Sequence, residues 1–161
     1  MISGYNPSMS SDQHPLLDTV KALVDASPTS WGDVLDAVTQ HFDCPVGTVH
    51  LLDAADGMLH LKAHRGLPPP VLDKVQVIPV GKGMAGIAAE RKEPVQVCNL
   101  QTDESGVARP GAKMTQMEGS LAAPMLKDGA VHGTIGVAKP TAYDFSEEET
   151  SLLMAVGALL A

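Results

Sequence analysis

Aromatic residues, cysteine and positive charge are scarce in this sequence, and each shortage excludes a class of protein. Five aromatic residues among 161 are too few for the stacking platforms that bind single-stranded nucleic acid. Lys and Arg total 11 against 19 Asp and Glu, and the net charge of −8 opposes contact with nucleic acid or an anionic membrane surface. No signal peptide or long apolar run is present. We therefore expect a cytoplasmic protein with neither a nucleic-acid nor a membrane partner.

The two cysteines, Cys44 and Cys98, are too few and too isolated for a disulfide framework or a C-x-x-C metal site. A thiol redox cycle needs a resolving thiol within reach, and Cys44 is not expected to reach Cys98. We expect Cys98 to be a small buried apolar residue at a strand end, where burial without a basic neighbour raises the thiol pKa. No metal site is predicted.

Length and hydrophobic content indicate one domain with a core and room for a small pocket, since 44% of the 161 residues are hydrophobic. Residues 1–11, rich in serine, have the composition of a flexible leader, and residues 12–161 then form the single domain. Helical and strand patterns alternate along it, which favours a mixed domain over a bundle or a sandwich.

Two amphipathic helices are predicted near the start of the domain. The first begins near Pro15 and ends before Pro28. The second follows Ser30, with Asp33 in place of the usual Glu of a capping box, and ends before Pro45.

Six strands are predicted, at residues 47–52, 58–64, 75–80, 94–97, 119–126 and 131–138. Asp-Gly turns join the first pair and the last pair into antiparallel hairpins. Alternation in the second strand predicts two opposite faces, one with Leu59, Leu61 and Ala63 and the other with His60, Lys62 and His64.

The glycines of residues 81–86 have the G-x-G-x-x-G spacing of dinucleotide-binding folds. Pro94 leaves room only for a short helix after them, which argues against that fold. The free backbone N–H groups of Gly83, Met84 and Ala85 could bind a carboxylate or phosphate. A tight turn with no binding role explains the glycines equally well.

The polar run 99–118 is long for a connection in a domain of this size, and we expect a lid or a disordered segment. Arg109 would close over an anionic ligand from this lid, and the alternative is a solvated loop charge. Met117 would line an adaptable apolar pocket, and the alternative is ordinary core packing.

Six sequence blocks in order together resemble the GAF domain family over about residues 30–161. They are Val49-His50-Leu51-Leu52-Asp53, His64-Arg65-Gly66-Leu67, Val80-Gly81-Lys82-Gly83-Met84-Ala85-Gly86, Ala123-Pro124-Met125, Ile135-Gly136-Val137 and Phe145-Ser146-Glu147-Glu148-Glu149. The resemblance implies an α+β, GAF/PAS-like fold. Its central six-stranded antiparallel sheet would carry the terminal helices on one face and a pocket of short helices and loops on the other.

The resemblance leaves the ligand and any cofactor unknown. GAF domains bind cyclic nucleotides, bilins, haem, metals, amino acids or 2-oxo acids, and some bind nothing and serve as dimerisation modules. A catalytic branch, the free methionine-(R)-sulfoxide reductases, carries cysteines in the glycine block and the lid, but here Ala85 stands in that block and the lid has none.

The candidate pocket residues are His50, His64, Gly83, Met84, Ala85, Cys98, Arg109, Met117 and Ser120. The two histidines lie on neighbouring predicted strands and would be able to face one cavity, although no acidic or cysteine ligand completes a metal site with them. Solvent-facing or satisfied core histidines are the alternative.

The last predicted helix starts at Ser146, with Glu149 completing a capping box. Its far face carries no charge, so we expect a homodimer interface formed by Leu152, Met154, Ala155, Ala158 and Leu159. The leading hypothesis is a non-enzymatic sensory domain that binds a small molecule and acts through a homodimer or a partner protein. A sulfoxide-reductase-like enzyme and a ligand-free dimerisation module are the alternatives.

Overall fold

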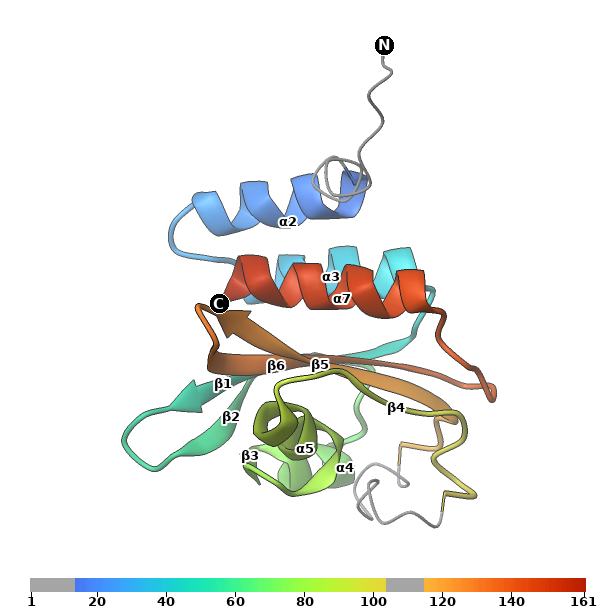
Figure 1. The fold of residues 1–161 in the computed structure, drawn as a ribbon. Coiled ribbons are helices and arrows are strands. Elements are labelled where there is room, and N and C mark those ends of the chain that lie inside the picture. Colours follow the sequence, from blue (N-terminus) through green and yellow to red (C-terminus); the bar gives the residue numbers. More distant parts are fainter. Residues whose placement is uncertain (1–13, 104–114) are drawn as a thin grey trace.

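The computed structural model describes residues 14–103 and 115–161 (Figure 1). Six antiparallel strands form one sheet in the order β3-β2-β1-β6-β5-β4. They are β1 (Val46–Asp53), β2 (Met58–Arg65), β3 (Val77–Pro79), β4 (Val95–Val97), β5 (Gly119–Lys127) and β6 (Ala130–Lys139). The predicted α+β fold with a six-stranded antiparallel sheet is confirmed, and β1–β2 and β5–β6 are the predicted hairpins.

Three helices cover one face of the sheet: α2 (Pro15–Asp25), α3 (Trp31–Phe42) and α7 (Glu147–Leu160). Figure 1 shows α3 and α7 between the sheet and α2, which lies on their outer side. Their apolar stripes meet the sheet in one core, where Val20, Val38, Ile135 and Val156 are fully buried. Each such side chain contributes about 1.5–3 kcal/mol by leaving water, and this burial holds the helices on the sheet.

The two predicted capping boxes have different outcomes. At α7 the Ser146 hydroxyl accepts from the Glu149 N–H at 3.1 Å, and the Glu149 carboxylate accepts from the Ser146 N–H at 2.9 Å, so the box is confirmed. Ser30 is the N-cap residue of α3, but its side chain makes no capping hydrogen bond, and the box predicted there is wrong. Asp33 is one methylene shorter than the Glu that normally reaches back from that position.

Two shorter helices, α4 (Pro69–Val75) and α5 (Gly83–Arg91), lie on the opposite face of the sheet (Figure 1). Helix α4 was not predicted, and the strand expected at 75–80 is shortened to β3 because Val75 is the last residue of α4. Pro69 and Pro70 stand in the first turn of α4, where a residue without an N–H is tolerated. Among the described helices, none has the length and apolar character that a membrane span requires.

A bulge changes which residues of β2 share a face. Val49 pairs with Ala63 but His50 pairs with Leu61, so Lys62 is an extra residue between the two pairs. Val49 and Ala63 pack in the helical core, whereas His50 faces the side of α4 and α5. The alternation predicted for residues 59–64 is therefore wrong beyond Lys62, because one inserted residue moves all later side chains to the other face.

Candidate functional site

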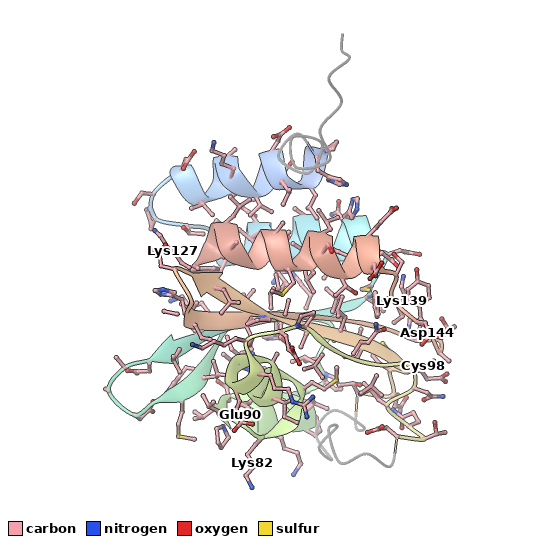
Figure 2. All side chains as sticks on the ribbon, viewed as in Figure 1. Lys82, Glu90, Cys98, Lys127, Lys139 and Asp144 are labelled. Carbon is pink, nitrogen blue, oxygen red and sulfur yellow. The ribbon has the colours of Figure 1, made fainter. Side chains whose placement is uncertain are left out.

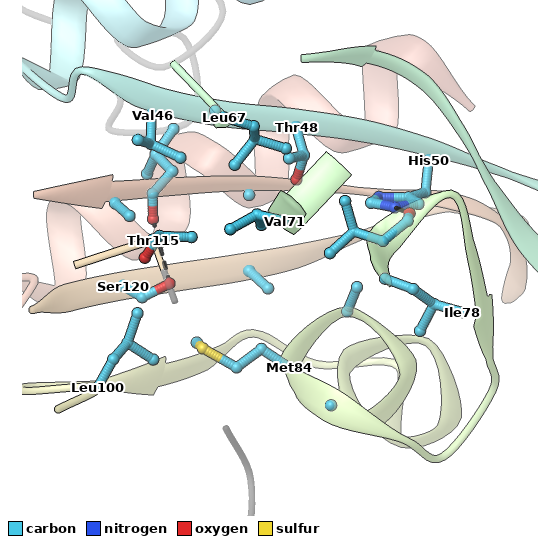
Figure 3. Close-up of a pocket in the computed structure, with 18 of the residues that line it drawn as sticks. Val46, Thr48, His50, Leu67, Val71, Ile78, Met84, Leu100, Thr115 and Ser120 are labelled. Carbon is cyan, nitrogen blue, oxygen red and sulfur yellow. Dashed lines mark hydrogen bonds between the residues drawn. The ribbon is translucent and has the colours of Figure 1, made fainter. Parts of the chain in front are cut away.

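A pocket of about 310 Å³ lies between the sheet and helices α4 and α5 (Figure 3). Its volume is at the lower end of the range for small-molecule sites. The walls are mainly apolar, with Val46, Leu67, Val71, Ile78, Met84 and Leu100 among the lining residues. The pocket therefore favours a ligand with an apolar body, and the few polar groups in its walls decide which ligand.

The first of these polar features is the start of α5. Gly83, Met84 and Ala85, three of the candidate pocket residues, form its first turn and all line the pocket. The N-cap residue Lys82 makes no side-chain capping hydrogen bond, so the first-turn N–H groups are not used by a cap. Together with the positive end of the helix dipole, these groups favour an anion.

The three glycines also form a tight turn, the alternative reading of residues 81–86. Gly81 and Gly83 have φ values of 91° and 69°, which favour glycine. A Cβ on Gly86 would lie 2.3 Å from the carbonyl oxygen of Pro79, so the helix also approaches β3 too closely for a side chain. The turn and the uncapped helix start are thus two aspects of one structure.

His50 is the second polar feature of the pocket and is only 2% exposed. Its Nε2 lies 2.8 Å from the carbonyl oxygen of Val75, the last residue of α4. Nδ1 is buried and has no hydrogen-bond partner among the described residues. Burial lowers the pKa of His50, against the opposing effect of the Val75 hydrogen bond and with the help of the charge on His60. Burial therefore favours the neutral form of the ring.

His64 and Ser120 were both predicted for the pocket, with different outcomes. Ser120 lines it from β5, and its hydroxyl donates to the Val137 carbonyl at 3.4 Å. His64 is paired with Thr48, which lines the pocket, but His64 is not itself among the lining residues. The two histidines therefore do not make a pair around one ligand.

Cys98 is exposed, and the expectation that it is buried is wrong. It follows the three-residue edge strand β4, where the chain has no further strand to cover it. Figure 2 shows Cys98 close to Asp144; desolvation and this carboxylate raise the pKa of the thiol. Cys98 does not line the pocket, and burial raises the pKa of the Cys44 thiol to about 11. Neither thiol has the lowered pKa of a nucleophile.

Of the two predicted lid residues, only Met117 belongs to the part of the chain that the structure describes. Met117 packs against the small apolar cluster of α5, β4 and β5 and does not line the pocket. Arg109 lies outside the described residues. Among the described residues 115–118, Thr115 lines the pocket.

The candidate interface residues of α7 are partly covered within the chain. Leu152, Met154, Ala155 and Leu159 are partly buried and pack against the helical core, while Ala158 is exposed. Helix α2 packs on α7, which accounts for much of its apolar far face without a second subunit. Dimerisation remains a prediction.

Sequence reasoning missed Lys74 and Thr48, which also line the pocket. Lys74 belongs to α4, and the missed helix explains the missed residue. The signal was present: two prolines followed by Val71 at a buried position mark the start of a short helix. Lys74 adds a positive charge at the pocket in a chain of net charge −8.

A cluster of three side chains that could ligate a metal lies at the β1–β2 turn, apart from the pocket. The potential ligating atoms of Asp53, Asp56 and His60 are within 4.8 Å of one another. His60 Nε2 is 2.7 Å from Asp56 Oδ2. Both carboxylates also accept from turn N–H groups, of Ala55 and Met58 respectively. These hydrogen bonds show that the three side chains stabilise the turn, and none of the three residues lines the pocket.

Solved structures with the same fold include GAF domains of larger proteins and a reductase. A GAF domain of a phosphoenolpyruvate-protein phosphotransferase from Acinetobacter is 24% identical with a TM-score of 0.75, covering 97% of this chain and 91% of that one. Its counterpart from Coxiella burnetii is 20% identical with a TM-score of 0.77, covering 96% and 92%. The free methionine-R-sulfoxide reductase from Neisseria meningitidis, in complex with its substrate, is 17% identical with a TM-score of 0.73, covering 99% and 91%.

These identities establish a shared fold and leave the activity open. No curated protein matches the chain. A family model described as a GAF domain matches residues 32–161. The match includes the whole sheet and every helix that lines the pocket. Because this match extends over most of its length, the chain belongs to the GAF domain family.

Proposed function

We propose that this chain is a non-enzymatic sensory GAF domain that binds a small organic anion and passes the signal through a homodimer or a partner protein. The observation that carries the proposal is the apolar pocket of about 310 Å³ with the uncapped start of α5 in its wall. Such a site pairs an apolar body with one anionic group.

Two groups in the wall favour a negatively charged ligand. Backbone N–H groups at Gly83, Met84 and Ala85 offer donors that cannot lose their protons, and Lys74 adds a full charge. The chain as a whole carries a net charge of −8, which repels anions at long range. Local donors in a low-dielectric wall outweigh that repulsion, because the screening length is only about 8 Å at physiological salt.

The polar side chains in the described wall do not form a nucleophile with its base, which supports a role without catalysis. Ser120 donates to a backbone carbonyl, and the His50 ring is bonded to Val75 instead of to a hydroxyl or thiol. An activated nucleophile needs a base within hydrogen-bond reach. Cys98 lies outside the pocket with a raised thiol pKa.

Native mass spectrometry of gently purified protein tests binding and subunit number together. We expect a dimer that carries extra mass, and loss of that mass in Ala85→Trp, which fills the pocket. Glu90→Trp, at an exposed position of the same helix, is the matched control and should keep the mass. A bare wild-type species that also fails to bind any organic anion in titration would contradict the proposal.

The enzymatic alternative rests on the likeness to the Neisseria reductase and has its own test. Purified protein is incubated with free methionine-R-sulfoxide and a thiol reductant, and methionine is measured. We expect no turnover above that of the Cys98→Ser variant. Turnover that disappears in Cys98→Ser would make this chain a reductase and overturn the sensory proposal.

A further inference from the structure

Gly136 lies in the middle of β6, where the backbone does not require a glycine. Its φ is not positive, and an added Cβ would lie 3.3 Å from Thr48 Oγ1 and 3.6 Å from the Leu121 carbonyl oxygen. Every other described glycine has a positive φ or would bring a Cβ within 2.9 Å of another atom. Glycine inside a strand costs stability and often marks a close approach of a ligand to the backbone. Gly136 lines the pocket, so the open space above its backbone belongs to the cavity.

The neighbours of Gly136 in the sheet make this part of the pocket floor flat. Gly136 pairs with Ala122 of β5 on one side and with Thr48 of β1 on the other, and all three residues line the pocket. Ala122 extends only a methyl group from the sheet, so a ligand placed there rests close to the strand backbone. A planar group makes contact with such a floor over its whole face, whereas a puckered group leaves gaps that forfeit dispersion energy.

Met84 belongs to the first turn of α5 and lies across the cavity from the sheet. It packs with Ala122 in one apolar cluster and also lines the pocket. Figure 3 shows Met84 and Val71 reaching into the cavity from α5 and α4. A methionine sulfur makes favourable contacts with aromatic rings, and no Phe, Tyr or Trp is among the described lining residues. The cavity therefore offers a flat floor and a polarisable sulfur to an aromatic ring of the ligand.

The Thr48 hydroxyl is an open polar group at the edge of this floor. It makes no hydrogen bond with another described residue, and its oxygen is not one of the enclosed unpaired atoms, so it is accessible from the pocket. Figure 3 shows the Thr48 oxygen turned toward Val71 in the cavity. Because a hydroxyl both donates and accepts, it can bond to a polar atom on the edge of a ring that lies on Gly136.

We propose that the pocket selects an aromatic carboxylate whose ring lies flat on Gly136 and Ala122, with a polar ring substituent bonded to the Thr48 hydroxyl. This inference rests on the proposed function and names its ligand class. The carboxylate lies at the start of α5, where the uncapped N–H groups favour an anion. Gly136 determines the specificity, because a side chain at that position lifts the ring from the floor.

Calorimetric titration with phenylacetate and cyclohexylacetate tests the ring, since the two acids differ in the ring alone. Phenylacetate should bind about fivefold more tightly, which is within the range that a sulfur–aromatic contact supplies. In Gly136→Ala this preference should vanish. Gly32→Ala, the same substitution in the first turn of α3 and outside the pocket, is the matched control and should keep the preference. Thermal unfolding checks that both variants are folded.

The contact with Thr48 is tested with phenylacetates hydroxylated at ring carbon 2, 3 or 4. At least one of them should bind about fivefold more tightly than phenylacetate, as expected for one added hydrogen bond. Thr48→Val keeps the shape of the side chain and should remove this gain while phenylacetate binds as before. A gain that is absent in the wild type, or that survives in Thr48→Val, would show that Thr48 does not bond the ligand.

A readout on the wild-type protein needs no variant. The Gly136 Hα that occupies the place of a Cβ should shift to lower frequency with phenylacetate, because the ring current acts on protons above the ring face, and cyclohexylacetate has no ring current. An unshifted Gly136 in the phenylacetate complex would place the ring elsewhere. Equal binding of the two acids that is still lost in Ala85→Trp would overturn the ring preference and leave the anion pocket intact. Failure of every acid to bind would overturn both.

Discussion

A buried neutral histidine makes stability depend on pH in a defined direction. Burial holds the pKa of His50 below its ordinary 6.5, and His41 is shifted the same way by its own desolvation. Below pH 6.5 the unfolded chain takes up protons that the folded chain resists, so the free energy of unfolding falls as the pH falls through the folded pKa. Above pH 6.5 this contribution is fully present.

We therefore expect the free energy of unfolding in urea to decrease between pH 7.5 and 5.0, with a slope of at most about 1.4 kcal/mol per pH unit for each histidine. His50→Gln should flatten the curve in this range, and the remaining slope would come chiefly from His41. An identical slope in wild type and variant would show that His50 keeps an ordinary pKa.

At the scale of single elements, two serines in equivalent places make a matched experiment. Ser146 caps α7 through its side chain, whereas Ser30 occupies the same place in α3 without a side-chain bond. Ser146→Ala should lower the free energy of unfolding by about 1 kcal/mol, and Ser30→Ala should change it by a few tenths. Chemical denaturation of both variants checks this, and equal losses would contradict the assigned caps.

The contact of α7 with β5 depends on a residue without a side chain. A Cβ on Gly157 would lie 2.6 Å from the Pro124 carbonyl oxygen, which belongs to the sheet backbone and cannot rotate away. Gly157→Val should therefore cost about 1–3 kcal/mol of stability. Ala158→Val places the same side chain at the next, exposed position and should have a much smaller effect in the same thermal unfolding measurement.

At the scale of the whole molecule, we predict that two copies meet at α7. Ala158 is the exposed member of the candidate interface, while Leu159 also packs on the core of its own chain. Ala158→Glu should give a monomer in light scattering with little change in thermal stability, because it buries a charge only if a second subunit is present. Ala130→Glu, at the exposed first residue of β6, is the control and should remain a dimer. A dimer that survives Ala158→Glu would place the interface elsewhere.

The sequence by itself determined the order of the six strands, the two hairpins, the α7 cap and the short helix that follows the glycines of residues 81–86. These depend on local chemistry: apolar spacing, turn residues, and groups that lie within a few residues of one another. Helix α4 was missed although its two prolines were visible, because a helix of 7 residues is too short to show a stripe.

Only the tertiary structure decided which predicted site residues meet. One inserted residue at Lys62 decides which side chains of β2 share a face of the sheet. Helix α2 covers part of the α7 face from which a dimer was predicted. The pairing of His50 with Val75 joins residues that are 25 positions apart in the sequence. Such contacts depend on register and packing between distant segments, which no local pattern encodes.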